Sequence, residues 1–291
     1  MPLRPKVMTF CGVPQPELEA CRAALIPAPL EATVSYGGGT ALGPAAIIQA
    51  SQAMELYDEV VGCQPVDQGI YTHAGVDVRG PLTEVVARIE RAVAAELAAG
   101  RLPVVLGGEH TVSLGPLQAL VASRGTDFTV LCLDAHTDLR DAYEGQRLCH
   151  ATVMRRALDL GLSVRHLGLR SSSQAEVELI KEAGLSPLWA HEVHDDPHWL
   201  NRALAGLSGP VYLSLDVDGL DAGIMPATGT PEPGGLSWQQ VTAWLSAVCA
   251  RHQVLGLDIV ELAPLTEQPA WDFTAARLLY RALGLIFRGV S

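Results

Sequence analysis

The sequence lacks any apolar run long enough to cross a membrane, and it lacks paired cysteines. Its longest apolar stretches, at 128–133 and 211–215, are far shorter than the roughly 20 residues that a membrane-spanning helix requires. The six cysteines contain no C-x-x-C pair, and a chain of 291 residues can bury a core without disulfide staples. We therefore expect no membrane span and a cytoplasmic location.

The sequence is also poor in positive charge, with 20 Lys and Arg against 32 Asp and Glu and a formal net charge of −12. This balance disfavours nucleic acid, anionic lipid and polyphosphate partners, and it favours small cationic ones. Charged residues make up only 18% of the chain, below the about 25% usual for soluble proteins. The shortage indicates a large core together with surface buried between subunits, so we expect a homo-oligomer.

Short β-branched, apolar runs alternate with longer amphipathic segments along most of the chain. Strands are predicted at 7–11, 104–106, 128–133, 164–169, 211–215 and 254–260. Helices are predicted at 44–56, 81–99, 113–122, 151–160, 174–183, 237–250 and 274–287. This alternation is typical of a three-layer α/β/α fold with a mainly parallel, doubly wound sheet. No linker or repeat divides the chain, so we expect a single domain over residues 1–291.

Acidic residues and histidines directly follow four of the predicted strands. They are, in chain order, His110, Asp134, His136, Asp138, Asp216, Asp218 and Glu261. The carboxyl ends of parallel strands lie along one edge of a sheet, where open α/β folds bind their ligands. Residues two apart on an extended chain point the same way, so these side chains are expected to converge.

The first six of these residues supply four carboxylates and two imidazoles, with no Lys or Arg inside the clusters. Burying such a set without counter-charge would cost many kcal/mol, so cations are expected to balance it. Six ligands suit two divalent ions roughly 3.5–4 Å apart that share carboxylates and a water. Oxygen-rich ligands favour Mn²⁺, although zinc, cobalt or nickel could bind the same set. A single Asp here is more often a helix cap, but caps need no such repeated spacing.

Longer motifs around these residues resemble the ureohydrolases, the arginase and agmatinase family of manganese amidinohydrolases. The matching segments are GGEH at 107–110, DAHTD at 134–138, SLDVDGLD at 214–221, PATGTP at 226–231 and DIVE at 258–261. The agmatinase branch is most similar, through SYGGGT at 35–40 and HATVMRR at 150–156. The loop at 139–149 lacks the Asn-, Ser- and Thr-rich composition of arginases.

The resemblance implies two Mn²⁺ per subunit and an arginase-like fold assembled as a trimer or hexamer. One ion would be held by His110, Asp134, Asp138 and Asp216, and the other by Asp134, His136, Asp216 and Asp218. It further implies that His150 shuttles a proton and that Glu261 receives the substrate guanidinium group. Asp138 is expected to orient the attacking water. The implied reaction releases urea from a guanidino compound, preferably agmatine, which would give putrescine.

Cys149 departs from the serine that related agmatinases tend to carry before the histidine. A thiol nucleophile is disfavoured at this position, because a thiol among carboxylates holds its proton more tightly. A second group of histidines is close together in sequence and contains His191, His194 and His198. It lacks the H-E-x-x-H spacing of a helical metal site, so it is predicted to lie in a surface loop.

Three other functions stay open at this point. An arginase or guanidino-acid hydrolase would carry a basic side chain placed to receive the substrate carboxylate. A two-metal phosphoesterase usually has Lys or Arg beside the metals, and such residues are scarce near these clusters. A non-catalytic, polyamine-binding homologue has no need of His150 and Glu261 beside all six ligands.

Overall fold

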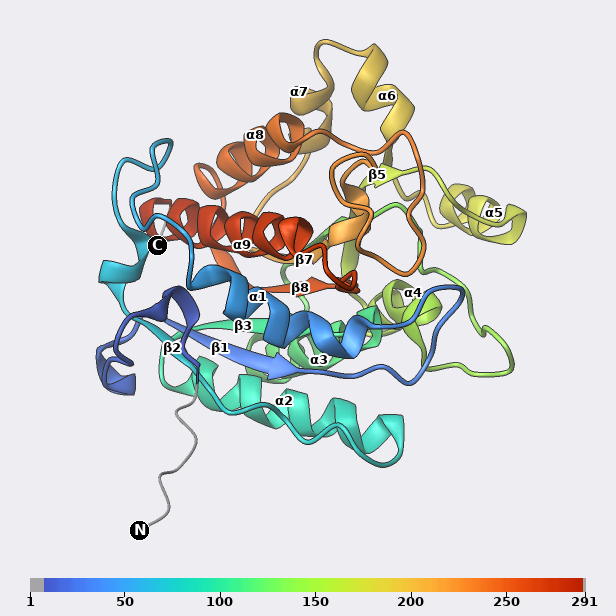
Figure 1. The fold of residues 1–291 in the computed structure, drawn as a ribbon. Coiled ribbons are helices and arrows are strands. Elements are labelled where there is room, and N and C mark those ends of the chain that lie inside the picture. The colour runs from blue at the N-terminus through green and yellow to red at the C-terminus, as the bar shows by residue number, and fades with distance from the viewer. Residues whose placement is uncertain (1–7, 290–291) are drawn as a thin grey trace.

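The computed structural model describes residues 8–289 and contains one sheet of parallel strands between two layers of helices (Figure 1). The order across the sheet is β2-β1-β3-β8-β7-β4-β5-β6. The strands are β1 (Ala23–Ala28), β2 (Ile70–Thr72), β3 (Leu102–Gly107), β4 (Thr129–Leu133), β5 (Ser163–Leu169), β6 (Leu188–Trp189), β7 (Val211–Asp216) and β8 (Val254–Val260). All pairings between these strands are parallel, which confirms the predicted fold class.

Helices cover both faces of the sheet (Figure 1). The first face packs against α1 (Gly43–Ser51), α6 (Ala190–Asp195), α7 (Trp199–Leu204), α8 (Trp238–Cys249) and α9 (Ala270–Arg288). The second face packs against α2 (Leu82–Ala98), α3 (Leu114–Arg124), α4 (Val153–Asp159) and α5 (Gln174–Glu182). All seven predicted helices are present, whereas the short α6 and α7 were not predicted.

Burial on both faces explains the unbroken apolar character of the central strands. All six residues of β7 are buried. Leu213 and Leu215 face the layer that contains Trp244, whereas Tyr212 packs on the opposite side with residues of α3 and α4. A strand covered on both faces has no polar positions to alternate with, so its sequence is a continuous apolar run.

The predicted first strand at 7–11 is wrong where the structure describes it. Residue 7 lies outside the described residues, and Phe10–Gly12 form a single turn of 3₁₀ helix. The backbone N–H groups of Phe10 and Cys11 donate to the hydroxyls of Thr72 and Ser51, so this apolar segment is buried without joining the sheet. The first strand is β1, which was missed because alanine and proline are poor strand residues.

Two further details differ from the sequence-based expectations. The strands β2 and β6 contain only three and two residues, too few to show a pattern. His191 and His194 lie on helix α6, so the surface-loop prediction is wrong for them; the imidazole of His194 contacts the carbonyl of Gly234 at 3.2 Å. Between residues 8 and 289, no helix has both the length and the apolar character needed to cross a membrane.

Candidate active site

The four strands that carry the predicted site residues are neighbours in the middle of the sheet, in the order β3-β8-β7-β4. Their carboxyl ends are level, because Leu133 pairs with Leu215 and Asp216 pairs with Val260. The residues that follow these strands therefore meet at one edge of the sheet. The parallel topology brings together side chains that lie more than a hundred residues apart in sequence.

A tight turn after β3 brings His110 to this edge. The N–H groups of Gly108 and Glu109 donate to the carbonyls of Ala28 and Leu30, at 3.0 and 2.8 Å. A Cβ atom at Gly108 would lie only 2.0 Å from the carbonyl oxygen of Leu30, so no larger residue fits. The glycine thus allows the close backbone contact between this turn and Leu30.

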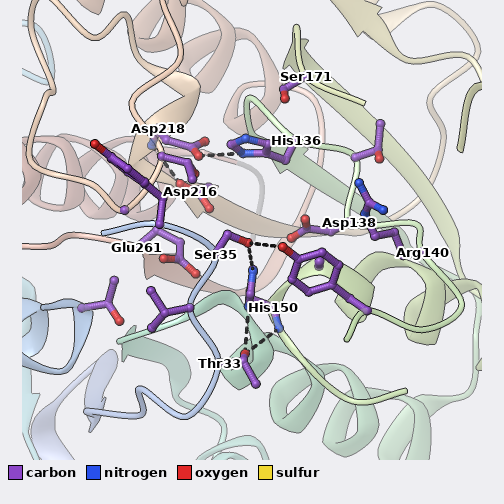
Figure 2. Close-up of a pocket in the computed structure, with 18 of the residues that line it drawn as sticks. Thr33, Ser35, His136, Asp138, Arg140, His150, Ser171, Asp216, Asp218 and Glu261 are labelled. Atoms are coloured by element: carbon purple, nitrogen blue, oxygen red, sulfur yellow. Dashed lines mark hydrogen bonds and ion pairs between the residues drawn. The ribbon is translucent and has the colours of Figure 1, made fainter. Parts of the chain in front are cut away.

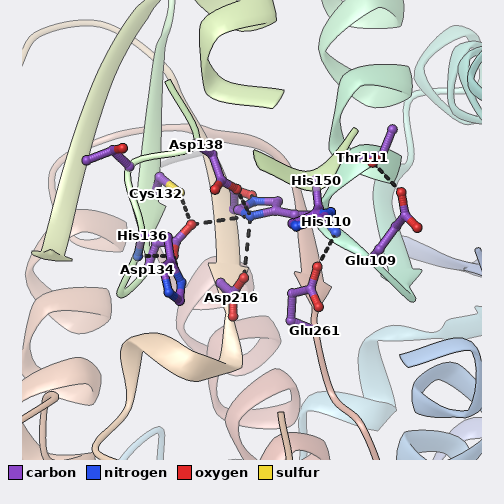
Figure 3. A network of polar contacts seen from close by, with 12 residues as sticks. Glu109, His110, Thr111, Cys132, Asp134, His136, Asp138, His150, Asp216 and Glu261 are labelled. Atoms are coloured by element: carbon purple, nitrogen blue, oxygen red, sulfur yellow. Dashed lines mark hydrogen bonds and ion pairs between the residues drawn. The ribbon is translucent and has the colours of Figure 1, made fainter. Parts of the chain in front are cut away.

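The Nδ1 atom of His110 faces three carboxylates (Figure 3). It lies 3.3 Å from Asp134 Oδ2, 3.0 Å from Asp138 Oδ2 and 3.4 Å from Asp216 Oδ2. This atom is fully buried and has no hydrogen-bond partner. A ring nitrogen that faces several carboxylate oxygens offers the kind of ligand set that a metal ion requires.

The hydrogen bond at the other ring nitrogen leaves Nδ1 as the nitrogen that can bind either a proton or a metal ion. His110 Nε2 lies 2.9 Å from Ser214 Oγ, and the Ser214 hydroxyl donates to Asp258 Oδ1 at 2.8 Å. Because the only proton of Ser214 goes to Asp258, its oxygen accepts from the Nε2–H of His110. Ser214 and Asp258 therefore fix the tautomer of His110 in the form that can bind a metal through Nδ1.

A second cluster forms around His136. Its Nδ1 atom lies 2.9 Å from Asp218 Oδ2 and 3.8 Å from Asp134 Oδ1. Asp134 thus presents one carboxylate oxygen to each imidazole. Asp218 is held in place by the N–H of Ala135, which donates to its Oδ1 at 2.9 Å.

The pKa values reflect crowded, buried negative charge. Burial and the charges of Asp218 and Asp138 raise the pKa of Asp134 to about 7. Burial and the neighbouring Asp218 and Asp134 also raise the pKa of Asp216 well above its ordinary value.

Burial and the neighbouring carboxylates have opposite effects on the pKa values of His110 and His136. Burial alone would lower the pKa of His110 and of His136. The neighbouring aspartates outweigh that effect: the pKa of His110 lies well above its ordinary value and that of His136 is about 10. In turn, the hydrogen bond from His136 holds the pKa of Asp218 at about 2, against the effect of its burial. The site therefore attracts positive charge.

No basic side chain balances this charge: within the described part of the chain, the four aspartates form ion pairs with His110 and His136 and with no Lys or Arg. Two groups of side chains have ligand atoms within 4.8 Å of one another, His110 with Cys132 and Asp134, and Asp134 with His136 and Asp218. The orphaned Nδ1 of His110 and the uncompensated carboxylates fit a pair of divalent cations.

Cys132 is a neighbour of this site that sequence reasoning missed. Its thiol donates to Asp134 Oδ2 at 3.6 Å. Burial and the charge of Asp134 raise the pKa of this thiol well above its ordinary value, so the group is a hydrogen-bond donor to a carboxylate rather than a thiolate ligand.

A pocket of about 200 Å³ opens over this edge of the sheet (Figure 2). Its lining includes His136, Asp138, His150, Asp216, Asp218 and Glu261. Tyr36, Gly37 and Thr40, from the glycine-rich segment before α1, form part of its rim. Of the eight predicted site residues, six reach the pocket, and His110 and Asp134 lie buried beneath it.

Asp138 and Glu261 both adopt left-handed backbone conformations, with φ of 51° and 63°. Such conformations are costly for residues other than glycine and concentrate at functional sites. Glu261 is held there by its N–H, which donates to the carbonyl of Gly108 at 2.8 Å. The N–H of His110 donates to Glu261 Oε1 at 2.7 Å, and burial raises the pKa of the Glu261 carboxyl to about 8.

His150 lies on the opposite wall of the pocket from the strand ends (Figure 2). Its Nδ1 atom is 2.8 Å from Thr33 Oγ1, and its Nε2 atom is 2.8 Å from Ser35 Oγ. The adjacent Cys149 is buried and does not line this pocket, and burial raises the pKa of its thiol. These features agree with the expectation that Cys149 is not a nucleophile.

Arg140 and Tyr143 line the pocket beside His150, and sequence reasoning assigned no role to either. The guanidinium carbon of Arg140 lies 5.2 Å from the centre of the Tyr143 ring, and its Nε atom is 3.8 Å from Glu176 Oε2. Glu176 also accepts hydrogen bonds from Thr137 and from the N–H of Leu139. No motif marks these residues, because the loop at 139–149 has no regular pattern.

Comparisons with known proteins identify the family. The arginase family profile matches residues 21–284. The chain belongs to the arginase family. It is thus a ureohydrolase, a hydrolase of carbon–nitrogen bonds in linear amidines, as the motifs predicted.

Several proteins of this family are similar over most of their length. An N(1)-aminopropylagmatine ureohydrolase of Synechocystis sp. is 38% identical over 271 residues, which are 89% of this chain and 87% of that protein. An agmatinase of Bacillus anthracis is 35% identical and covers 92% of each chain. The crystal structure of the agmatine ureohydrolase of Thermoplasma volcanium superposes with a TM-score of 0.85 at 30% identity, covering 92% of this chain and 91% of that one.

Proposed function

We propose that this protein hydrolyses the guanidinium group of a small cationic substrate to urea and an amine, with agmatine as the first candidate. The observation that supports this proposal most directly is a shared pocket of about 200 Å³. Glu261, an acceptor for a guanidinium, and His150, a proton carrier, line this pocket together with the aspartates of the proposed metal site. The names of the Synechocystis and Bacillus relatives support this substrate class.

We further propose two Mn²⁺ per subunit at the strand ends. His110, Asp134, Asp138 and Asp216 would hold one ion, and Asp134, His136, Asp216 and Asp218 the other. The contacts support this division, because His110 Nδ1 faces the first three aspartates and His136 Nδ1 faces Asp218 and Asp134. When bound, two such ions supply charge compensation and make water more acidic and nucleophilic at neutral pH.

Glu261 positions the substrate in this proposal. One of its oxygens accepts from the N–H of His110, and the remaining acceptor sites of the carboxylate face the pocket. A guanidinium presents parallel N–H groups that match a carboxylate, so the pair fixes both the place and the plane of the reacting carbon. The bound cation also favours the ionised form of Glu261 over the protonated form that burial favours.

The remaining steps need a water held for attack and a proton for the leaving amine. Asp138 lines the pocket and can accept a hydrogen bond from the attacking water. The water oxygen adds to the guanidinium carbon, and the bond between that carbon and the alkyl-bearing nitrogen breaks. His150 gives a proton to this nitrogen as the amine departs and recovers one from the added water. Protonation is required because an amine leaves poorly as an anion.

Two other substrates with different tails are candidates, and one observation favours each of them. N(1)-aminopropylagmatine carries the same guanidinium on a longer cationic chain, and the 38% identical relative is named for it. A guanidino acid would place its carboxylate near Arg140, the arginine that lines the pocket. Arg140 already contacts Glu176 and Tyr143, so its charge is partly satisfied, and agmatine stays the first candidate.

Urea release from a panel of substrates tests the proposal. Metal-stripped protein would be assayed with and without Mn²⁺ on agmatine, N(1)-aminopropylagmatine, arginine, 4-guanidinobutyrate and 3-guanidinopropionate. We expect urea from a cationic substrate, dependent on Mn²⁺, with the guanidino acids slower by about tenfold or more. Release only from a guanidino acid would contradict the assignment of the tail, and no release from any substrate would contradict the proposed reaction.

A further inference from the structure

The hydrogen bonds around His150 differ in kind on the two sides of its ring. Thr33 lies at Nδ1 and Ser35 at Nε2, each at 2.8 Å (Figure 2). Thr33 is anchored to a buried carboxylate, whereas Ser35 is partnered by another hydroxyl. This difference determines which nitrogen can exchange a proton.

On the Nδ1 side, the carboxylate of Glu109 accepts hydrogen bonds from four donors. Glu109 Oε2 accepts from the N–H groups of Ala32 and Thr33, and Oε1 accepts from the hydroxyls of Thr33 and Thr111. Figure 3 shows the contact with Thr111. Glu109 is 1% exposed. The buried carboxylate is the acceptor in all four hydrogen bonds, one of which comes from the Thr33 hydroxyl.

The hydroxyl proton of Thr33 is therefore used in the hydrogen bond to Glu109. Its hydroxyl donates to Glu109 Oε1 at 2.8 Å, and its oxygen also lies 3.2 Å from the N–H of His150, which donates to it. A hydroxyl has one proton and two lone pairs, so the second lone pair of Thr33 accepts from Nδ1–H. The ring of His150 thus carries a fixed proton on Nδ1.

On the Nε2 side, the hydroxyls can reverse their direction. Ser35 Oγ lies 3.3 Å from the hydroxyl oxygen of Tyr143, to which it donates. In that state Ser35 accepts from Nε2–H. When Nε2 loses its proton, Tyr143 can donate to Ser35 and Ser35 to Nε2, so both protonation states of the ring find partners. The edge of the Tyr143 ring also packs against the imidazole, with centroids 5.7 Å apart.

We propose that Thr33, backed by Glu109, is a positioning residue that fixes His150 with Nδ1 protonated, and that Ser35 and Tyr143 let Nε2 alone give and recover the proton. This inference rests on the proposed function, since it assigns the atom that protonates the departing amine. In each turnover Nε2 gives one proton to the amine nitrogen and recovers one from the water that has added to carbon. No residue on the Nδ1 side gains or loses a proton.

The test removes the Thr33 hydroxyl without changing the shape of the side chain. Steady-state urea release, Mn²⁺ content and thermal melting would be measured for wild type, Thr33→Val and Thr33→Ser, with Thr242→Val on helix α8 as the matched control. We expect Thr33→Val to lower kcat by about 10–100-fold, part of the usual contribution of a general acid, with KM changed by less than about threefold. Thr33→Ser should recover kcat to within about threefold of wild type, because it restores the hydroxyl.

Ser35→Ala provides a second route, because Ser35 lies in the exposed rim loop and its loss leaves Glu109 fully partnered. We expect kcat to fall by about 3–30-fold with two metal ions retained. If wild type releases urea and both Thr33→Val and Ser35→Ala keep wild-type kcat, the inference is wrong. It is also wrong if Thr33→Ser is as impaired as Thr33→Val. If wild type itself releases no urea from any substrate of the panel, the proposed function fails instead.

Discussion

The backbone N–H of His110 donates a hydrogen bond to Glu261 Oε1 at 2.7 Å. His110 follows β3 and Glu261 follows β8, and these two strands are neighbours in the sheet. The contact ties the proposed guanidinium acceptor directly to a proposed metal ligand. Because both side chains are set by strand ends, the distance between substrate and metal cluster is built into the sheet and does not depend on a mobile loop.

Glu261→Gln should lower kcat/KM for the substrate without loss of bound metal. The amide keeps the size and can still accept from His110, but it cannot form a charge-assisted pair with the guanidinium. Hydrogen bonds to charged groups contribute roughly 1.5–3 kcal/mol, so kcat/KM should fall by about 10–150-fold. Steady-state kinetics and metal content check this, with the exposed Glu267→Gln as the matched control. Unchanged kcat/KM would remove Glu261 from the substrate site.

His150→Ala and Asp216→Ala should separate catalysis from metal binding. His150 contacts Thr33, Ser35 and Tyr143 but none of the proposed metal ligands, so its loss should lower kcat by about 10²–10⁴-fold with near two Mn²⁺ per subunit. Asp216 faces His110 Nδ1, so its loss should reduce metal content as well as activity. Atomic absorption on dialysed protein distinguishes the two. Equal metal loss in both variants would contradict these roles.

The sequence predicted most of the site because the site is made of strand ends. Each of Asp134, Asp216 and Glu261 comes directly after a buried apolar run, and a parallel sheet places such positions side by side whatever their separation in the chain. Thr33 and Tyr143 gave no signal, since they lie in irregular loops whose paths depend on tertiary contacts. Strand β1 was missed for a related reason: its alanines and proline are accommodated by burial on both faces and not by local strand propensity.

The metal-free protein should lose stability as pH rises from 6 to 9. The pKa of Asp134 is about 7, that of Glu261 about 8 and that of His136 about 10, all above the ordinary values. The folded state therefore binds more protons than the unfolded state in this range, and its stability falls as these protons are lost. Asp218, with a pKa of about 2, stays ionised throughout and adds no pH dependence.

Thermal melting at fixed protein concentration measures this effect. We expect the Tm of the metal-free protein to fall by about 5 °C or more between pH 6 and pH 9. Mn²⁺ should raise the Tm most at the alkaline end, because bound cations replace the lost protons. Asp134→Asn is the control and should show a flatter profile and little response to Mn²⁺. A metal-free Tm that rises with pH over this range would contradict the proposed charge balance.

Arg140→Gln should reveal which tail the pocket accepts. If the substrate tail is cationic, Arg140 repels it weakly across the pocket, and the variant should keep agmatine kcat/KM within about threefold of wild type or raise it slightly. If the substrate is a guanidino acid, loss of a bidentate carboxylate partner should lower kcat/KM for that acid by about 10–100-fold. We expect the first outcome for agmatine, and a further loss of any residual activity on 4-guanidinobutyrate.

Arg155→Gln, whose arginine pairs with Asp159 outside the pocket lining, is the matched control. A large fall in agmatine turnover in Arg140→Gln alone would mean that this arginine orders the pocket wall through Glu176 and Tyr143, and the tail assignment would then have to rest on the substrate panel.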